Sequence, residues 1–252
     1  MNQNDFSLLL KKHLNPREIK SIFFLTGAGI SAESGLKTFR DQNGLWENHR
    51  IEEVATPESF RNNPQKVHDF YNERRKQLID AFVSPNAAHI SLGELKKNFH
   101  GKIHVITQNV DNLHERGGVE DVIHMHGELL KIKCNYCGQS YATQEFNIST
   151  NSACQECDSV GGMRPDIVWF GEIPYYMNEI EALLASCDLF VSVGTSGQVY
   201  PAAMFVQMAK NFTQCKTIEL NLEASFGVNH FDFSYQGKAS ELVPQLTKFL
   251  LT

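Results

Sequence analysis

Four cysteines in the middle of the chain have the spacing of a metal site. Cys134 and Cys137 form one Cys-x-x-Cys pair, and Cys154 and Cys157 form a second. Each two-residue gap lets a pair hold one edge of a tetrahedral ion, and the distance between the pairs is usual for a four-thiolate zinc site. Four thiolates leave no open coordination position, so we expect one structural Zn²⁺ per chain. The alternative, four unrelated buried cysteines, is disfavoured by this spacing.

The other two cysteines have no such pattern. Cys187 and Cys215 fall within or beside apolar runs, and we expect both in the core. Six cysteines without a secretory signal indicate thiols or metal ligands rather than disulfides.

Two histidines could act as bases. His124 and His126 lie two apart at the end of a short apolar run, so they share a strand face unless the strand ends between them. A neutral imidazole near pH 7 is suited to take a proton from a ribose hydroxyl. Either histidine could instead be structural, and residue type alone does not choose between them.

A glycine turn follows the first apolar run of the chain. Gly27, Gly29 and Ala32 come directly after the run 22–25, in the pattern of a dinucleotide-binding turn between a strand and a helix. In that pattern the glycines allow a tight turn and a close approach to a pyrophosphate. The N–H groups at the start of the expected helix would face the phosphates.

Polar clusters also follow later apolar runs, where a parallel sheet binds its ligands. Asn109 and Asp111 could hold the nicotinamide end of a dinucleotide, and Asn221 with Glu223 could accept hydrogen bonds from ribose hydroxyls. Turn residues collect at strand ends in any protein, but the clusters together favour a polar cleft. The donors that could bind phosphate are Gly194, Thr195 and Ser196.

Alternating strands and helices must position these groups. The expected strands are 22–26, 103–107, 122–126, 167–171, 189–194 and 217–222. The expected helices are 5–14, 65–82, 86–99, 178–186, 201–211 and 240–251. This alternation predicts an α/β fold, a Rossmann-like parallel sheet with helices on both faces, plus a small zinc-ribbon domain. The predicted Rossmann-type domain comprises 1–128 and 166–252, with a helical insert at about 37–90, and the zinc-binding domain is 129–165.

Composition excludes several classes of protein. The 252-residue chain has a formal net charge of −6, which argues against stable nucleic-acid binding. Its first residues are too charged, and their apolar run too short, for a signal peptide or a membrane span. We therefore expect a soluble, cytoplasmic protein without membrane contacts, and a compact monomer.

Together the motifs resemble those of the sirtuins, which are NAD-dependent protein-lysine deacylases. The matching segments are 27–35, 38–40, 107–114, 126–128, the four cysteines, 194–196 and 221–223. The resemblance implies that NAD is a consumed co-substrate and that acylated lysine side chains of proteins are the substrates. The products would be nicotinamide, free lysine and O-acyl-ADP-ribose.

The resemblance also assigns residues. It implies that His126 is the catalytic base, with Asn109 as a second catalytic residue, and that His124 is a structural neighbour. Glu223 would be the ribose-binding acid, in place of the acid that redox Rossmann proteins carry about twenty positions after the glycines. The implied NAD contacts are Gly27, Ala28, Gly29, Ala32, Glu33, Thr38, Phe39, Arg40, Trp46, Gln108, Asn109, Val110, Asp111, Gly194, Thr195, Ser196, Asn221, Leu222, Glu223 and Ala239.

A Tyr-x-x-Arg pair indicates which acyl groups are removed. Tyr71 and Arg74 are three apart on an expected helix and share a face, where a phenol and a guanidinium would suit a carboxylate. Without a family, a solvated helix face would be the favoured explanation of this pair. The pair resembles that of class III sirtuins, and Ala55 matches a small residue that widens their acyl pocket. We therefore expect removal of acetyl, succinyl and malonyl groups.

The segment 168–172 resembles the strand that pairs with the substrate peptide in the family, a form of β-augmentation. The implied peptide contacts are Val168, Phe170, Gly171 and Glu172.

Three other functions remain open from the residues. An NAD-using oxidoreductase would share the glycine turn. A zinc-ribbon nucleic-acid module would share the cysteines, although the insert offers only Lys131, Lys133 and Tyr136 for that purpose. ADP-ribosyl transfer would share the step in which nicotinamide leaves.

Overall fold

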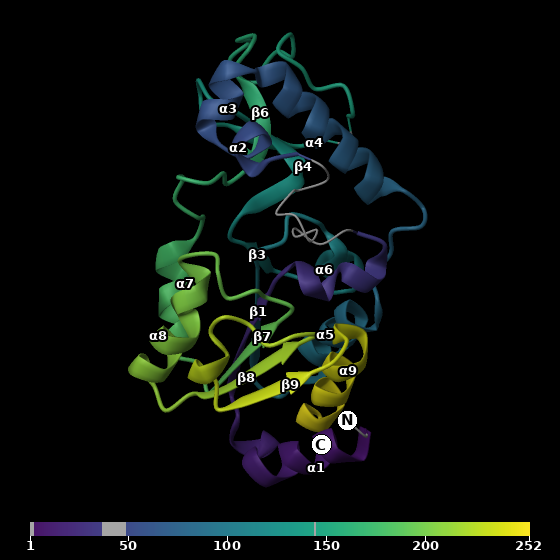
Figure 1. The fold of residues 1–252 in the computed structure, drawn as a ribbon, viewed down its shortest axis with the longest axis vertical. Coiled ribbons are helices and arrows are strands. Elements are labelled where there is room, and N and C mark those ends of the chain that lie inside the picture. The colour runs from purple at the N-terminus through teal and green to yellow at the C-terminus, as the bar shows by residue number, and fades with distance from the viewer. Residues whose placement is uncertain (1–2, 37–48, 144) are drawn as a thin grey trace.

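A parallel sheet and a smaller antiparallel sheet lie one above the other along the long axis of the molecule (Figure 1). The computed structural model describes residues 3–36, 49–143 and 145–252. Within these residues, no helix is long and apolar enough to span a bilayer.

The larger sheet has six strands, and all its neighbouring strands pair in parallel. In spatial order they are β3 (Val122–His124), β2 (Lys102–Thr107), β1 (Ser21–Thr26), β7 (Leu189–Val193), β8 (Lys216–Asn221) and β9 (Phe233–Gln236). The strand order reverses between β1 and β7. In such sheets the crevice for a ligand lies at the carboxyl ends of the strands at this point.

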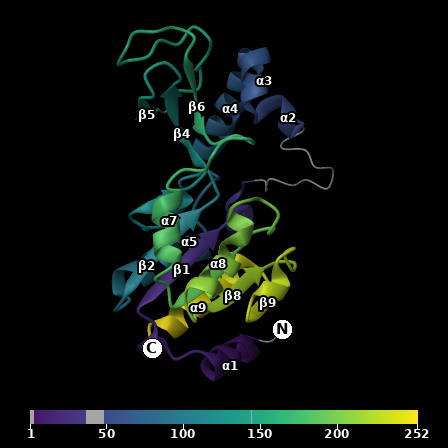
Figure 2. The same cartoon turned by 90° about the vertical axis from the view of Figure 1, so that its left-hand side faces the viewer.

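Helices cover both faces of this sheet, which confirms the predicted α/β class (Figure 2). Successive residues of β1 point to opposite faces, so Phe24 packs in one apolar cluster and Phe23 in the other. The first face is covered by α1 (Gln3–His13), α5 (Ala87–Asn98) and α9 (Ala239–Leu250). The second is covered by α7 (Met177–Leu184) and α8 (Phe205–Phe212).

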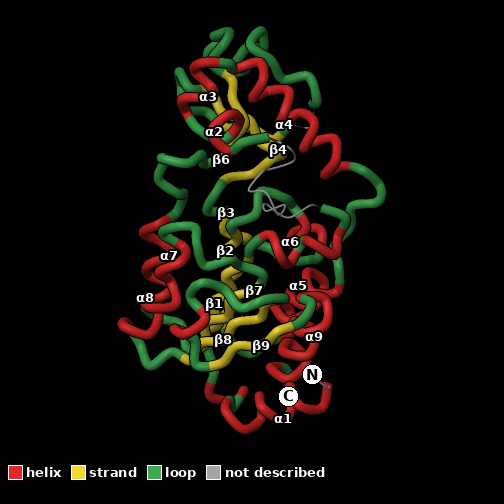
Figure 3. Tube along the Cα trace, viewed as in Figure 1, coloured by secondary structure: helices red, strands yellow, loops and turns green. Residues whose placement is uncertain are grey.

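The smaller sheet has three antiparallel strands in the order β5-β4-β6. They are β4 (Gly127–Cys134), β5 (Ser140–Ala142) and β6 (Met163–Ile167). Three helices of the predicted insert pack on this sheet through a shared apolar cluster, and not on the large sheet (Figure 3). They are α2 (Ile51–Val54), α3 (Pro57–Asn62) and α4 (Pro64–Ile79).

The chain passes from one sheet to the other next to a candidate base. β3 of the large sheet ends at His124, and β4 of the small sheet begins at Gly127, so Met125 and His126 form the link. The predicted strand over 122–126 is therefore too long by two residues. Gly127 has a φ of +83°, a left-handed conformation that favours glycine.

Two further predictions about local structure are wrong. The expected strand at 167–171 is the end of β6, which stops at Ile167 and pairs with β4, so it does not join the parallel sheet. Residues 168–170 continue as irregular chain because Trp169 is buried against the helices on the small sheet. The helix expected after the glycine turn is instead a pair of 3-10 turns, Ala28–Ile30 and Ala32–Ser34, ended by Gly35 at a φ of +88°.

Strand β9 is absent from the predictions. It is a short edge strand in which Phe233 and Tyr235 alternate with polar residues, and it carries no continuous apolar run. The remaining short helix, α6 (Leu113–Arg116), follows the polar segment after β2.

Candidate active site

The loops after β1 and β7 interlock through glycines. The Gly27 N–H donates to the Val193 carbonyl at 3.0 Å, and the Gly29 N–H donates to the Gly194 carbonyl at 2.9 Å. A Cβ at Gly29 would lie 2.6 Å from the Gly194 Cα, and one at Gly27 would lie 2.7 Å from the Gly194 oxygen. We refer to Gly27, Gly29 and Gly194 as the glycine seam. The glycines thus permit two loops to touch, and the Gly29 N–H is bonded within the protein.

Beside the seam, a buried polar network fixes Asn109 and Asp111. The Asn109 amide donates to the Gly27 carbonyl at 3.1 Å and to the Ser31 hydroxyl at 3.2 Å. The Asp111 carboxylate accepts from the Ser31 hydroxyl at 3.0 Å and from the Leu113 N–H at 3.1 Å. Burial raises the pKa of Asp111 above its usual value, and these two donors oppose the shift. Both predicted residues therefore have fixed orientations at the carboxyl edge of the sheet.

Three polar residues of this network are absent from the predicted site. Ser31 bridges Asn109 and Asp111, and its hydroxyl lies 3.5 Å from His89 Nε2. His114 Nε2 lies 2.9 Å from the Thr26 hydroxyl. Burial lowers the pKa of both histidines, that of His89 to about 4, so both are neutral at pH 7. Ser31 stands inside the glycine motif and could have been found from it, whereas no local pattern marks His89.

The two candidate bases have different surroundings. Both ring nitrogens of His124 have partners, since Nδ1 lies 3.2 Å from the Asn109 carbonyl and Nε2 lies 2.6 Å from Glu115 Oε1. Burial lowers the pKa of His124, but the Glu115 carboxylate outweighs it and the pKa lies above its usual value. These contacts fit a structural role for His124.

His126 is bonded through one nitrogen only, among the residues that the structure describes. Its Nδ1 lies 3.1 Å from the Gln108 carbonyl, which can only accept, so Nδ1 carries the proton and donates. Burial lowers the pKa of His126, and the carbonyl partly offsets this. At pH 7 the ring is therefore neutral, and Nε2 has the lone pair that a base needs.

The other half of this edge is built from the loops after β7 and β8. The Asn221 amide donates to the Thr195 carbonyl at 2.6 Å, and the Thr195 hydroxyl lies 2.8 Å from that of Ser192. The Glu33 carboxylate accepts from the Ser240 N–H at 3.1 Å, which brings Glu33 to Ala239 at the start of α9. Glu33 thus satisfies an N–H at the end of a helix.

The structure places most of the predicted cofactor contacts on these loops, and it leaves four outside the described residues. Gln108 lies on these loops too, with its carbonyl bonded to His126, and those on the loops that have no contact given above are Ala28, Ala32, Val110, Ser196, Leu222 and Glu223. Those outside the described residues are Thr38, Phe39, Arg40 and Trp46.

Tyr71 and Arg74 lie on α4 and are both buried, which excludes a solvated helix face. The Tyr71 hydroxyl accepts from the Trp169 indole N–H at 3.0 Å, and burial raises the pKa of Tyr71, so it stays protonated. The Arg74 guanidinium lies over the Phe70 ring at 4.7 Å, and its Nε donates to Gln77 Oε1 at 3.1 Å. Its Nη1 is buried and has no hydrogen-bond partner among the described residues.

The segment after β6 runs between α2 and the link that carries His126. The Val168 N–H donates to the His126 carbonyl at 2.9 Å, and the Phe170 N–H donates to the Ala55 carbonyl at 3.0 Å. Gly171 has a φ of +90°, and a Cβ added at this position would have no other atom within 4 Å. The Glu172 side chain is occupied within the protein, where it accepts from Arg164 at 2.7 and 2.9 Å. Its predicted contact with a substrate peptide stays a prediction.

The four predicted metal ligands converge, with all their sulfur atoms within 4.8 Å of one another. The Cys134 and Cys157 sulfurs lie 3.8 Å apart, and those of Cys137 and Cys154 lie 3.6 Å apart. Four sulfurs at about 2.3 Å from a tetrahedral Zn²⁺ lie about 3.8 Å from one another. Tyr136 and Glu156 N–H groups each donate to a sulfur at 3.4 Å. The cluster therefore fits a structural zinc, whereas Cys187 and Cys215 lie in the core as predicted.

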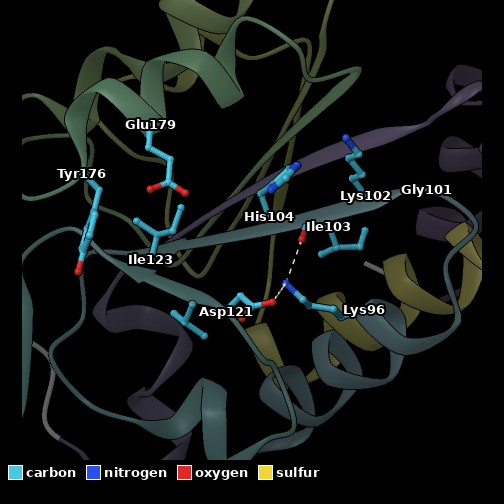
Figure 4. Close-up of a pocket in the computed structure, with 10 residues that line it drawn as sticks. Lys96, Gly101, Lys102, Ile103, His104, Asp121, Ile123, Tyr176 and Glu179 are labelled. Carbon is cyan, nitrogen blue, oxygen red and sulfur yellow. Dashed lines mark hydrogen bonds and ion pairs between the residues drawn. The ribbon is translucent and has the colours of Figure 1, made fainter. Parts of the chain in front are cut away.

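A hollow beside the edge strand β3 lies outside this site (Figure 4). It is lined by groups of both charges, and Lys96 crosses it to reach the Ile103 carbonyl at 3.3 Å and Asp121 at 3.9 Å. It includes Lys102 at the amino end of β2, whereas ligands of such sheets bind at the carboxyl ends.

Comparisons with known proteins agree with this geometry. Residues 27–201 match the model of the Sir2 family. The chain is 55% identical over 232 residues to an NAD-dependent protein deacylase of Vibrio parahaemolyticus, covering 92% of this chain and 95% of the relative. It is 54% identical over 230 residues to one of Pasteurella multocida, covering 91% and 97%.

Solved structures give the same result. A Sir2 homologue in complex with NAD superposes with a TM-score of 0.85 at 34% identity, covering 99% of this chain and 94% of that one. Sir2Af2 bound to a myristoylated histone peptide superposes with a TM-score of 0.75 at 31% identity, covering 98% and 97%.

Proposed function

The chain belongs to the Sir2 family, and we propose that this NAD-dependent protein deacylase removes succinyl and malonyl as well as acetyl groups from lysine. The observation that carries the acyl preference is the buried guanidinium of Arg74. NAD is the co-substrate and zinc the structural metal in this reading.

The guanidinium of Arg74 has more N–H donors than the described residues around it have acceptors for. Its nearest carboxylate, Glu73, lies 3.4 Å away but is itself 62% exposed, so water screens most of that attraction. Leaving a buried charged N–H without an acceptor costs free energy. A carboxylate at the end of an acyl chain would accept from Nη1, next to Tyr71 on the same face of α4.

The proposed chemistry assigns the base role to His126. The chemistry that NAD would supply is a ribose carbon that takes the acyl oxygen as nicotinamide leaves. One water molecule would then release the lysine, so that the products are nicotinamide, free lysine and O-acyl-ADP-ribose. His126 Nε2 would take the proton of a ribose hydroxyl, because Nδ1 is committed to Gln108. Asn109 and Asp111, held through Ser31, would orient the ribose and the nicotinamide. The segment 168–171 would pair with the substrate peptide, and Ala55 would border the acyl group.

The acyl preference is tested by replacing both receptor residues, Tyr71→Phe with Arg74→Met. We expect kcat/KM for succinyl-lysine and malonyl-lysine peptides to fall at least about 100-fold, since charge-assisted hydrogen bonds contribute about 1.5–3 kcal/mol each. For an acetyl-lysine peptide it should stay within about threefold. Lys76→Met, on the exposed side of the same helix, is the matched control. Equal losses on all three peptides would contradict a carboxylate receptor.

The base role is tested by His126→Ala. Removing a general base costs about 10²–10⁴ in rate, and we expect that loss with acetyl and succinyl peptides alike. Because burial lowers the pKa of His126, the wild-type enzyme should lose activity only as the pH falls below about 6.5, where the imidazole takes up a proton. Full deacylation by the variant would show that another group is the base.

A further inference from the structure

Arg75 is fully buried on α4, next in sequence to Arg74, and it binds only neutral groups among the described residues. Its Nε donates to the Leu129 carbonyl at 2.9 Å, and its Nη1 donates to Asn72 Oδ1 at 2.7 Å. The Asn72 amide in turn donates to the Ile148 carbonyl at 2.8 Å. Two side chains of α4 therefore hold two carbonyls of the small-sheet region.

The two carbonyls belong to residues near the proposed base, His126, and near the metal cluster. Leu129 is on β4, close in sequence to His126, and its own N–H donates to the Val110 carbonyl at 2.8 Å. Val110 follows Asn109 and belongs to the loop whose Gln108 carbonyl holds the His126 ring. Ile148 lies between the two cysteine pairs, in one buried cluster with Cys134 and Cys154. A continuous path of bonds thus joins α4 to the loop of the base.

We propose that Arg75 is a positioning residue for deacylation. With Asn72, it fixes α4 on β4 and so sets the distance between the acyl receptor, Tyr71 and Arg74, and the base, His126. Arg74 and Arg75 thereby divide two tasks, since one faces the acyl group and the other holds the helix that carries it. This inference rests on the proposed function for its choice of acyl group.

Energetics supports a positional role over simple packing. Burial lowers the pKa of Arg75 to about 10, so the guanidinium is still charged at pH 7, and its Nη2 has no hydrogen-bond partner among the described residues. An apolar side chain of similar volume would avoid that cost. Hydrophobic contact is non-directional, however, whereas a hydrogen bond to a carbonyl constrains distance and angle. A buried charge at this position is explained if the placement of α4 on β4 is needed for deacylation.

The test compares Arg75→Met and Asn72→Ala with Lys76→Met as control, using acetyl-lysine and succinyl-lysine peptides. If Arg75 sets the register, its replacement raises KM for the succinyl peptide at least tenfold and changes KM for the acetyl peptide less than threefold. Asn72→Ala should show the same split to a smaller degree. A purely structural role would lower the active fraction, and so kcat, equally for both peptides. That result, or no loss at all, would overturn the proposal.

Two additions keep the test decisive. If Arg75→Met does not fold, Arg75→Lys keeps the charge and the apolar stem but loses the planar fork, and the same split is expected. If the wild-type enzyme shows no desuccinylation, the proposed acyl preference fails by itself. Hydrogen exchange then tests the positioning role of Arg75. The role is supported if the amides of α4 exchange at least tenfold faster in the Arg75→Met or Arg75→Lys variant than in the wild type, while the amides of β1 do not change. Unchanged exchange in α4 would overturn it.

Discussion

The two sheets of this enzyme are held together in different ways. The large sheet is buried on both faces by apolar side chains. Among the described residues, the buried cluster around the metal end of the small sheet consists of Ile132, Cys134, Ile148, Cys154 and Met163. Two of those five are predicted zinc ligands. The large sheet can therefore rely on the hydrophobic effect, whereas the metal end of the small sheet, beyond the cluster that it shares with α2, α3 and α4, has little apolar burial and would depend on a bound Zn²⁺.

Glycine also serves different purposes in the two regions. In the glycine seam, Gly29 provides space, since a Cβ would meet the backbone of Gly194. In the metal loop, Gly138 has open space around it but a φ of +76°, so it provides conformation. Steric exclusion against a packed backbone is more costly than a single left-handed residue.

Removal of zinc should produce the largest difference between the regions. With the metal chelated, or in Cys154→Ser, we expect amides of β4, β5 and β6 to lose protection from hydrogen exchange while β1, β2 and β7 keep theirs. Structural zinc contributes about 10–16 kcal/mol in small zinc peptides, far more than the small buried cluster can. Deacylation should be lost as well, because β4 begins next to His126. Cys215→Ser, in the core of the large region, is the control that should retain zinc. Simultaneous loss of protection in both sheets would contradict the comparison.

Alanine substitutions at Gly29 and Gly138 should destabilise the protein less than the loss of zinc, and by different amounts. Gly29→Ala forces the glycine seam apart and should lower the free energy of unfolding by about 2–4 kcal/mol. Gly138→Ala should cost only about 1–2 kcal/mol, the penalty of a left-handed alanine. Urea denaturation of the zinc-loaded protein measures both values. Equal losses of unfolding free energy in the two variants would contradict the different roles given to Gly29 and Gly138.

His68 should produce the smallest effect, and one that depends on pH. It is buried in the helices on the small sheet, burial lowers its pKa to about 4, and neither ring nitrogen has a partner among the described residues. Between pH 6.5 and about 4 the unfolded chain binds the extra proton, so stability that is complete above 6.5 declines as the pH falls. At pH 5 the loss from this residue is about 2 kcal/mol.

The variant His68→Leu should be as stable as the wild type at pH 7 and should lose less stability than the wild type at pH 5. The exposed His100, replaced in the same way, is the control. Parallel stability profiles for the wild type and His68→Leu would show that His68 is not the acid-sensitive group.

Local patterns predicted the parts of the molecule that depend on local chemistry. The apolar run of β1, the glycine turn and the cysteine spacing identified the parallel sheet, the crevice edge and the metal cluster. The contacts of the glycine seam could not be predicted in this way, because Gly194 is far from Gly29 in sequence and only the fold brings them together. The same holds for Arg75, whose acceptors lie on other elements, and for α4, whose helical pattern does not say which sheet it covers. Trp169 lies in an apolar run that resembles a strand but is buried against helices.

The link between β3 and β4 has a mechanical consequence. His126 occupies the point where the chain leaves one sheet for the other, so any rotation of the small sheet about this link moves the base least and the metal end most. Displacement in a rotation grows with distance from the axis. A rotation about this link would therefore change the spacing between the two sheets while leaving the imidazole next to the loops after β1 and β2.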